Sequence, residues 1–258
     1  MRLSMSLEYA PKGLVGLLTP QANTTAEIEF NALMPLGVSS LVARMTSRCS
    51  TLEARLLEYF DQLDLTLEQF ANAPLAAVAV ACTGSSYLIG PEREDVLFDD
   101  LSARHGFPVI PAGRSVVQAC QALSAHRIAL LSPYSESLTR ESVKYWQARG
   151  LDVISVVRIE PDASAFHPIY GIERAAASRA LQTLQIRDAQ AVIALGTGLP
   201  SLRMVLDHAQ GGGPPFFSCM VALAWNSLRL TGIGGAGVGD LTQLMAGTAW
   251  RERFEMRY

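Results

Sequence analysis

The chain has 258 residues but only four cysteines, Cys49, Cys82, Cys120 and Cys219, and these are widely spaced. No Cys-x-x-Cys pair and no histidine at ligand spacing accompanies them. We therefore expect no metal site and, in a reducing compartment, no disulfide framework. The net charge is −3, with no basic run and no acidic tail. Nucleic-acid-binding proteins normally carry a basic patch, so we expect no nucleic-acid partner.

Long apolar runs are missing as well. The longest apolar stretches have the length of a strand, so the sequence predicts no transmembrane helix and no membrane partner. Residues 1–9 lack the sustained apolar region and the cleavage site of a signal peptide. By default we expect a cytoplasmic location. Hydrophobic residues make up 49% of the chain, which is enough for one large domain or two small ones.

The sequence does contain an internal repeat. Residues 17–20 read Leu-Leu-Thr-Pro and residues 130–133 read Leu-Leu-Ser-Pro. At nearly the same separation, Ala-Cys-Thr-Gly at 81–84 is echoed by Leu-Gly-Thr-Gly at 195–198. Further matches pair residues 37–44 with 150–158 and, more faintly, 107–111 with 214–218. Several matches in one order at near-constant spacing indicate a duplication. The copies differ at one position, because Cys82 in the first copy corresponds to Gly196 in the second.

Each copy alternates short apolar runs with segments of helical spacing. The runs are bounded by glycine and proline and lie at 14–19, 38–43, 77–82, 107–110, 127–132, 152–157, 191–195 and 215–218. Such runs are typical of strands buried on both faces of a parallel sheet. The alternation predicts an α/β fold of two pseudo-symmetric Rossmann-like lobes, each with a four-stranded parallel sheet. We expect residues 1–113 with 220–258 to form the first lobe and residues 114–219 the second.

The fold predicts where a ligand binds. In open parallel sheets this is beyond the carboxyl ends of the strands, where the strand order reverses. With a strand order of 2-1-3-4, the strand ends at Pro20 and Cys82 are neighbours. Residues 132–134 and 196–198 form the equivalent rim of the second lobe. Two facing rims predict an active site in the cleft between the lobes.

Cys82 is the strongest candidate for chemistry. A free cysteine is often only a small buried hydrophobe. However, Cys82 closes a buried strand and is followed by Thr83, Gly84, Ser85 and Ser86. A strand end that leads into a helix offers free N–H groups, which bind carboxylates and lower a thiol pKa. We expect Cys82 to be catalytic and the other three cysteines to be packing residues.

Two other polar residues lie near the predicted cleft. Tyr134 follows a strand end, where its hydroxyl would donate to a substrate oxygen, although a lone tyrosine more often packs. Asn23 precedes Thr24 and Thr25 in a pattern that also suits a helix start. We expect a threonine to cap that helix and Asn23 to face the ligand. Residues 232–237 match the Gly-x-Gly-x-x-Gly pattern of dinucleotide-binding proteins. Because no strand precedes them, we expect a loop instead.

Taken together, these residues resemble the aspartate/glutamate racemase superfamily, most closely the branch of maleate cis-trans isomerase and arylmalonate decarboxylase. Residues 20–29 are similar to the isomerase's substrate-binding Pro-x-x-Asn-Thr-Thr stretch. Residues 132–134 look like the Tyr element of both enzymes, and residues 216–232 look like the decarboxylase's end region. The resemblance covers nearly the whole chain. It implies an enzyme that needs no cofactor, acts on a small carboxylic acid and is often a homo-oligomer. By carry-over it implies binding roles for Pro20, Asn23, Thr83, Gly84, Ser85, Ser86, Tyr134, Gly196, Thr197 and Gly198.

The missing second thiol limits the chemistry. The family's racemases and isomerases carry one cysteine in each lobe, and the second falls on Gly196 here. The decarboxylase keeps only the second-lobe thiol, so this chain looks like its mirror arrangement. Racemisation needs groups on both faces of the substrate and is disfavoured; in that view, Gly196→Cys should restore it.

The sequence leaves three hypotheses for the function open. The sequence slightly favours an arylmalonate-decarboxylase-like lyase, in which Cys82 gives a proton to an enediolate. The first alternative is a maleate-isomerase-like cis-trans isomerase with Cys82 as nucleophile. The second is a non-catalytic protein that binds a small acid.

Overall fold

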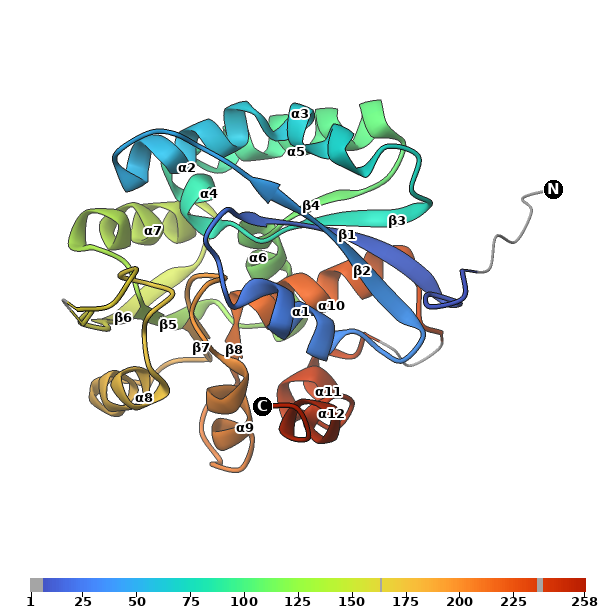
Figure 1. Ribbon diagram of the computed structural model, residues 1–258. Helices are drawn as coiled ribbons and strands as arrows, with labels where there is room; N and C mark the ends of the chain where they lie inside the picture. The colour runs from blue at the N-terminus through green and yellow to red at the C-terminus, as the bar shows by residue number, and fades with distance from the viewer. Residues whose placement is uncertain (1–6, 163, 236–238) are drawn as a thin grey trace.

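The computed structural model describes residues 7–162, 164–235 and 239–258. Strands and helices alternate along most of this chain (Figure 1). The first half contains β1 (Gly13–Pro20), α1 (Ala26–Leu33), β2 (Val38–Met45), α2 (Leu52–Asp61), α3 (Leu63–Leu67), the 3-10 helix η1 (Glu68–Phe70), β3 (Leu75–Val80), α4 (Thr83–Ile89), α5 (Pro91–His105), β4 (Val109–Pro111) and α6 (Ala112–Ala122). The second half contains β5 (Arg127–Ser132), α7 (Glu136–Ala148), β6 (Asp152–Arg158), α8 (Arg174–Thr183), β7 (Ala191–Ala194), α9 (Leu202–Ala209), β8 (Phe216–Ser218), α10 (Cys219–Thr231), α11 (Leu241–Ala246) and α12 (Arg251–Glu255).

The strands form two four-stranded parallel sheets with the same topology. Their orders are β2-β1-β3-β4 and β6-β5-β7-β8. In the first sheet Leu17 of β1 is paired with Val42 on one side and Ala79 on the other. In the second, Leu131 of β5 is paired with Val157 and Ala194. The predicted α/β fold of two similar lobes is confirmed, and so is the strand order that places the ends of the first and third strands side by side.

The local sequence explains where these elements begin. The central strands are continuous apolar runs because both faces of each sheet are covered by helices. Hydroxyl side chains cap several helices by accepting a backbone N–H: Thr51 caps α2, Ser135 caps α7 and Ser218 caps α10. Such a cap takes up one of the N–H groups that the first helical turn leaves unpaired.

The segment after the last strand packs across the molecule. Helix α10 follows β8 of the second sheet, yet it packs against α1, β3 and β4 of the first and against α6 (Figure 1). Helix α11 then contacts both α10 and α9. The division of the chain at residues 113 and 220 stays a prediction, although the packing of α10 agrees with it. Gly232 ends α10 in the left-handed conformation, and residues 1–6 and 236–238 lie outside the described chain.

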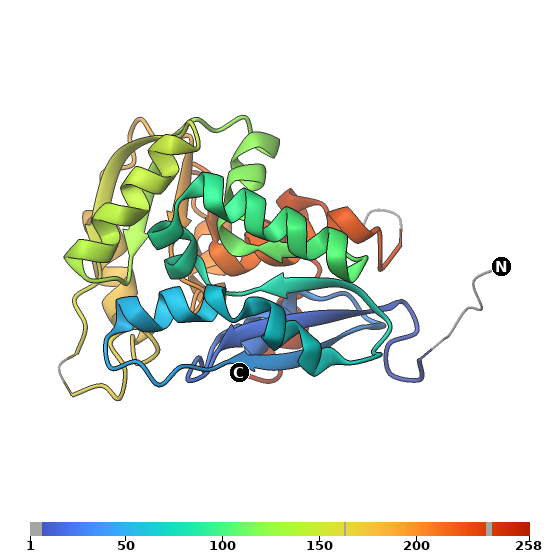
Figure 2. The ribbon, with the colours of Figure 1, turned by 90° about the horizontal axis from the view of Figure 1, so that it is seen from above.

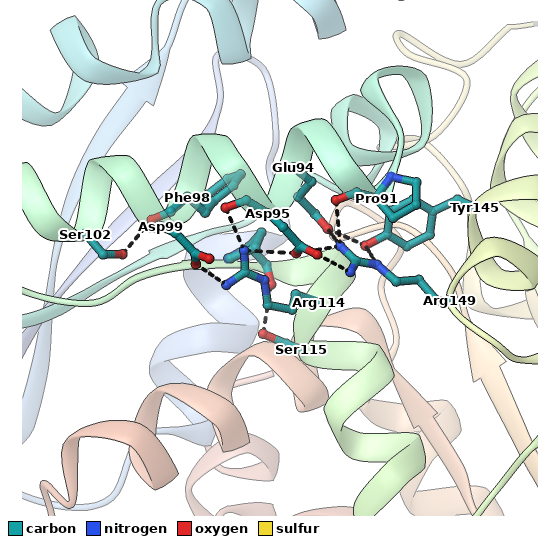
Figure 3. A network of polar contacts seen from close by, with 11 residues as sticks. Pro91, Glu94, Asp95, Phe98, Asp99, Ser102, Arg114, Ser115, Tyr145 and Arg149 are labelled. Carbon is teal, nitrogen blue, oxygen red and sulfur yellow. Dashed lines mark hydrogen bonds and ion pairs between the residues drawn. The ribbon is translucent and has the colours of Figure 1, made fainter.

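A buried ionic network joins the two lobes on the side of α5 (Figure 3). Arg149, which directly follows α7, donates to the carboxylates of Glu94 and Asp95, each at 2.7 Å. Glu94 is fully buried, and it also accepts a hydrogen bond from Tyr145. Arg114 of α6 extends the network along α5. A buried carboxylate is stable only when it is paired in this way, so the network fixes α7 against α5. None of the described helices has the length and apolarity needed to span a bilayer.

Candidate active site

A small cavity lies where the carboxyl ends of the two sheets face each other. It is lined by Pro20, Leu52, Leu56, Cys82, Thr83, Gly84, Tyr134, Ile169, Tyr170, Gly196, Thr197 and Gly198. The free space among these residues is about 30 Å³, which is room for roughly two water molecules. Helix α4, which begins at the cavity, packs between α2 of one lobe and α7 of the other (Figure 2). Both lobes therefore contribute to one site, at the place where such folds bind ligands.

Most of the predicted site residues line this cavity, but Asn23, Ser85 and Ser86 do not. Ser85 is hydrogen-bonded to Cys82 but does not itself line the cavity. The hydroxyl of Ser86 is buried and has no hydrogen-bond partner among the described residues. The proposed substrate-binding roles of these three side chains stay predictions, and any such role is indirect in this geometry.

Cys82 is the thiol of the cavity. It lies just beyond β3 at the start of α4 and is 3% exposed. Its Sγ is 3.1 Å from Ser85 Oγ, and Ser85 Oγ donates to the backbone carbonyl of Leu56 at 2.6 Å. Because a hydroxyl has a single proton, Ser85 accepts a hydrogen bond from the thiol in this arrangement.

Burial raises the pKa of Cys82 above its ordinary value of 9.0. Hydrogen bonds from Ser85 and from the backbone N–H of Gly84 offset only part of that effect. The N–H groups of the helix start do lower this pKa, as expected, but the net shift is upward because the desolvation of a buried thiolate outweighs them. At neutral pH Cys82 rests as a thiol, which is ready to act as an acid and must lose its proton before it attacks as a nucleophile.

Tyr134 contributes a hydroxyl from the second lobe. Its OH lies 2.8 Å from Thr83 Oγ1, so the two lobes are joined directly beside Cys82. Its ring packs edge-on against Tyr87, with centroids 5.9 Å apart. Burial, together with the neighbouring thiols, holds the pKa of Tyr134 well above its ordinary range. The hydroxyl is therefore protonated and can donate at any physiological pH.

Gly196 differs from its counterpart in the backbone as well as in the side chain. Its φ is +84°, whereas Cys82 has φ −148°. A Cβ placed on Gly196 would lie 2.9 Å from Pro133 Cγ and 3.2 Å from the hydroxyl of Tyr134. The left-handed backbone disfavours any residue with a side chain, and the space beside it is occupied. Gly196→Cys therefore does not simply restore the second thiol of the repeat.

Asn23 caps α1, where a threonine was expected to do so, and its contact with the ligand stays a prediction. Its Oδ1 accepts from the backbone N–H groups of Thr25 and Ala26 at 2.9 and 3.0 Å, so Asn23 itself takes up the helix start. Its Nδ2 donates to the carbonyl of Thr197 at 3.4 Å. The Thr25 hydroxyl donates to the carbonyl of Gly198 at 2.9 Å instead of capping α1. Both side chains hold the rim of the second lobe in place.

The sequence did not reveal four residues of the cavity wall. Leu52 and Leu56 come from α2, and Ile169 and Tyr170 come from the long connection between β6 and α8. The ring of Tyr170 is stacked on His167, with centroids 3.9 Å apart and planes inclined by 11°. The connection carries no recognisable motif, because its position over the cleft follows from the fold and not from local pattern.

Cys219 is another buried thiol, at the start of α10. It lies close to the backbone of Gly196 and to the side chains of Thr83 and Tyr87, which offset part of the effect of burial on its pKa. Burial raises its pKa to about 12. Cys219 does not line the cavity. Cys219 therefore packs next to residues of the site but does not contact the ligand space.

A buried carboxylate ties the lobes together near the cavity. Glu29 of α1 accepts hydrogen bonds from the backbone N–H of Leu202 at 2.9 Å and from the hydroxyl of Ser201 at 2.7 Å, at the start of α9. Burial raises the pKa of Glu29 from 4.5 to about 7, although these hydrogen bonds lower it in part. Across the same interface, Thr197 Oγ1 donates to the carbonyl of Ala81 at 2.6 Å. Among the described residues, no group of three or more histidine, cysteine or acidic side chains could hold a metal ion.

Comparison with known proteins identifies relatives across nearly the whole chain. The sequence model of the arylmalonate decarboxylase family matches residues 16–242. Maleate isomerase of Geobacillus stearothermophilus is 25% identical over 236 residues, which is 83% of this chain and 90% of the relative. Maleate isomerase of Nocardia farcinica (strain IFM 10152) is 26% identical over 224 residues, which is 83% and 88% of the two chains.

Solved structures share the fold. A cysteine-to-alanine mutant of the maleate isomerase Iso from Pseudomonas putida S16, crystallised with maleate, has a TM-score of 0.79 at 20% identity and covers 91% of this chain and 98% of its own. Arylmalonate decarboxylase has a TM-score of 0.67 at 18% identity and covers 89% and 99%.

Proposed function

Because the chain belongs to the arylmalonate decarboxylase family, we propose that it is a cis-trans isomerase of a small unsaturated dicarboxylic acid, similar to maleate isomerase, with Cys82 as the nucleophile. Its relatives are maleate isomerases and arylmalonate decarboxylase, so the chain is a cofactor-independent enzyme of one of these two kinds. The sequence alone slightly favours the decarboxylase-like reaction. The size of the cavity and the names of the relatives favour isomerisation.

The observation that carries this proposal is a single thiol at the end of a very small cavity. The 30 Å³ of free space is bounded by Leu52, Leu56, Ile169 and Tyr170. This space is smaller than a four-carbon diacid, so the cavity must widen for any substrate, and an aryl ring requires more room than a four-carbon diacid. A compact unsaturated diacid such as maleate is therefore the better match for this site.

A relative supports the idea that one thiol performs the covalent step. A cysteine-to-serine mutant of the Nocardia farcinica maleate cis-trans isomerase holds a covalently bound succinylcysteine intermediate. That structure has a TM-score of 0.76 and is 23% identical to this chain. Replacement of one cysteine there leaves a thiol that bonds to the substrate, and this chain has one thiol in its cavity.

The mechanism follows from the groups around Cys82. After losing its proton, the thiolate adds to one carbon of the C=C bond, and the π electrons move to the neighbouring carbon and its carboxylate. The resulting C–C single bond rotates, the π bond re-forms, and the thiolate leaves. Hydrogen-bond donors beside the substrate, such as Thr83 and Tyr134, stabilise the enediolate by roughly 3 kcal/mol each when well placed.

The runner-up is a malonate decarboxylase, and one observation favours it. With glycine at 196 there is no second thiol, and decarboxylation needs only one proton donor after CO2 has left. Cys82, protonated at neutral pH because of its raised pKa, suits that role. The cavity volume is the argument against the aryl members of this substrate class.

The test is direct. Purified protein is incubated with maleate while fumarate is followed by NMR, and in parallel with phenylmalonate and methylmalonate while CO2 release is followed. We expect fumarate from wild type, none from Cys82→Ser, and normal rates from Cys49→Ser, which removes a thiol outside the cavity. Release of CO2 without fumarate would make the protein a decarboxylase. Ligand binding without turnover of any of these acids would leave only the binding-protein alternative.

A further inference from the structure

The hydroxyl of Tyr134 lies beside the position of the missing second thiol. A Cβ on Gly196 would lie only 3.2 Å from the hydroxyl of Tyr134. In a two-thiol site of this fold, the second sulfur would project from that position toward the substrate. The phenol oxygen of this chain therefore stands next to where the second acid-base group of the repeat would stand.

The surroundings of Tyr134 suit proton transfer. The side chain lines the cavity together with Cys82, but it comes from the opposite lobe. Its oxygen has one described hydrogen-bond partner, Thr83 Oγ1 at 2.8 Å. Thr83 is adjacent to Cys82 in the chain, so the phenol is held in a fixed place relative to the thiol. Since either hydroxyl can donate in this pair, Thr83 can turn its proton toward a phenolate.

From this geometry we infer that Tyr134 is the second acid-base residue of the isomerisation and delivers a proton to the substrate carbon next to the one bonded to Cys82. This inference rests on the proposed function and assigns to Tyr134 the step for which a two-cysteine relative has a second thiol available.

The step balances without any other reactant. The Cys82 thiolate forms a C–S bond, and the π electron pair of the double bond becomes the enediolate. That carbon takes the phenolic proton, leaving a saturated thioether and a tyrosine phenolate, which accepts a hydrogen bond from Thr83. After rotation the phenolate removes a proton from the same carbon, the π bond re-forms, the C–S bond breaks and the thiolate is released. A carbon-centred enediolate is a stronger base than a phenolate, so a phenol with a high pKa can still protonate it.

Two other proton donors near the site, Cys219 and Ser85, do not line the cavity. Cys219 contacts Gly196 and Thr83 but does not line the cavity. Ser85 already donates its proton to the carbonyl of Leu56. Thr197 and Tyr170 of the second lobe also line the cavity, but Thr197 already donates its proton to the carbonyl of Ala81. Tyr134 is the one of the three whose hydroxyl is among the atoms nearest to the Cβ position of Gly196.

Tyr134→Phe tests the assignment when the covalent step and binding are measured separately. Enzyme mixed with saturating maleate is quenched in acid within one turnover, and the adduct on Cys82 is quantified by mass spectrometry. Without a proton donor the enediolate collapses back to maleate, so we expect the quenched adduct to fall at least tenfold. We expect kcat to fall by roughly 10² to 10⁴. The Kd of maleate, measured by calorimetry with Cys82→Ser and with the double variant, should change by no more than roughly tenfold, the effect of one hydrogen bond.

Control variants separate proton transfer from packing. Tyr87→Phe removes a buried hydroxyl from the ring that packs on Tyr134 and should keep most of the activity. Cys219→Ala should also keep it, and a loss there equal to that of Tyr134→Phe would transfer the role to Cys219. If Tyr134→Phe does not fold, Thr83→Val serves in its place. It should lower kcat more than KM, and Thr83→Ser should restore the rate.

The outcomes distinguish this inference from the proposed function. If wild type makes no fumarate and no adduct, the proposed function fails. If wild type isomerises maleate and Tyr134→Phe still accumulates the Cys82 adduct at saturating maleate, the function stands and the assignment of Tyr134 is overturned.

Discussion

The dependence of the rate on pH separates the two chemistries open to Cys82. Its pKa is raised above 9.0 by burial. An isomerase must first convert the thiol to a thiolate, whereas a decarboxylase uses the thiol as it stands. The rate is measured in a series of buffers from about pH 6.5 to about pH 8.5, a range in which the thiol remains mostly protonated.

The size of the effect follows from the ionised fraction. With a pKa of 9.0, about 1% of the thiol is ionised at pH 7, and a higher pKa makes the fraction smaller. While the fraction is small it grows about tenfold with each pH unit, and kcat/KM for maleate should grow with it. Over the two units of the series we therefore expect an increase approaching roughly a hundredfold. A reaction that needs the protonated thiol should instead stay level.

Few neighbouring groups disturb this measurement. The pKa values of Tyr59, Tyr134 and Tyr170 are all raised by burial, so these phenols remain neutral. The pKa of His167 is lowered below 6.5 by burial and by Arg55, so this imidazole is neutral as well. Glu29 titrates inside the window, at about 7, because it is buried. The same series on Glu29→Gln removes that contribution.

The assay is the initial rate of fumarate formation at low maleate concentration, with the protein checked for folding at each pH by circular dichroism. Fumarate formation at a rate that does not change between pH 6.5 and 8.5 would refute the reasoning, because it would mean that Cys82 is already ionised or does not attack. Alkylation of Cys82 by iodoacetamide over the same series reports the thiolate directly and should rise in parallel.

Three further predictions concern stability and backbone geometry. The folded pKa of Glu29 is raised from 4.5 to about 7, so its contribution to stability is full below pH 4.5 and is lost as the pH rises through 7. In the wild type the free energy of unfolding should therefore fall by about 3 kcal/mol over this range, and in Glu29→Gln this fall should be absent. Arg149→Met leaves the carboxylate of Glu94 buried without its cation and should lower stability by about 3–5 kcal/mol in urea titration. Gly196→Cys should lower it by about 1–3 kcal/mol and gain no racemase activity, because of the positive φ and the contact with Pro133.

Each of these has a matched control. Glu53→Gln changes an exposed carboxylate and should leave the pH dependence of stability as it is. Arg140→Met breaks an exposed pair with Glu136 and should cost no more than about 0.5 kcal/mol. Gly106→Cys places a side chain at a similar φ of +73° with no neighbour within 4 Å. Its loss of stability therefore measures the cost of the left-handed backbone alone. Equal losses at Gly106 and Gly196 would show that the contact with Pro133 is unimportant.

The repeat allowed much of the fold to be predicted. Short apolar runs between glycines and prolines located all eight strands, and the duplicated order placed Cys82 and Tyr134 on facing rims. These inferences succeed because a buried parallel strand leaves a local signature, and because the topology then determines which strand ends meet. The same logic pairs Cys82 with Gly196, and both residues line the cavity.

The parts that could not be predicted depend on the three-dimensional surroundings. The direction of the pKa shift of Cys82 depends on how completely the thiol is buried. The sequence showed only the helix start, which favours the thiolate. Asn23 caps α1 in place of a threonine, and Thr25 donates instead to the carbonyl of Gly198, which belongs to the other lobe. Tyr170 lies in a connection without periodicity. The pairing of Glu29 with α9 joins segments that no local pattern connects.

The left-handed backbone at Gly196 also constrains the evolution of this site. A glycine codon can become a cysteine codon by a single nucleotide change, so the loss of a thiol would ordinarily be easy to reverse. Here the returning side chain would meet a strained backbone and the ring of Pro133, and it would crowd the hydroxyl of Tyr134. A cysteine at this position would therefore need a second change, at Pro133 or Tyr134, to be accommodated.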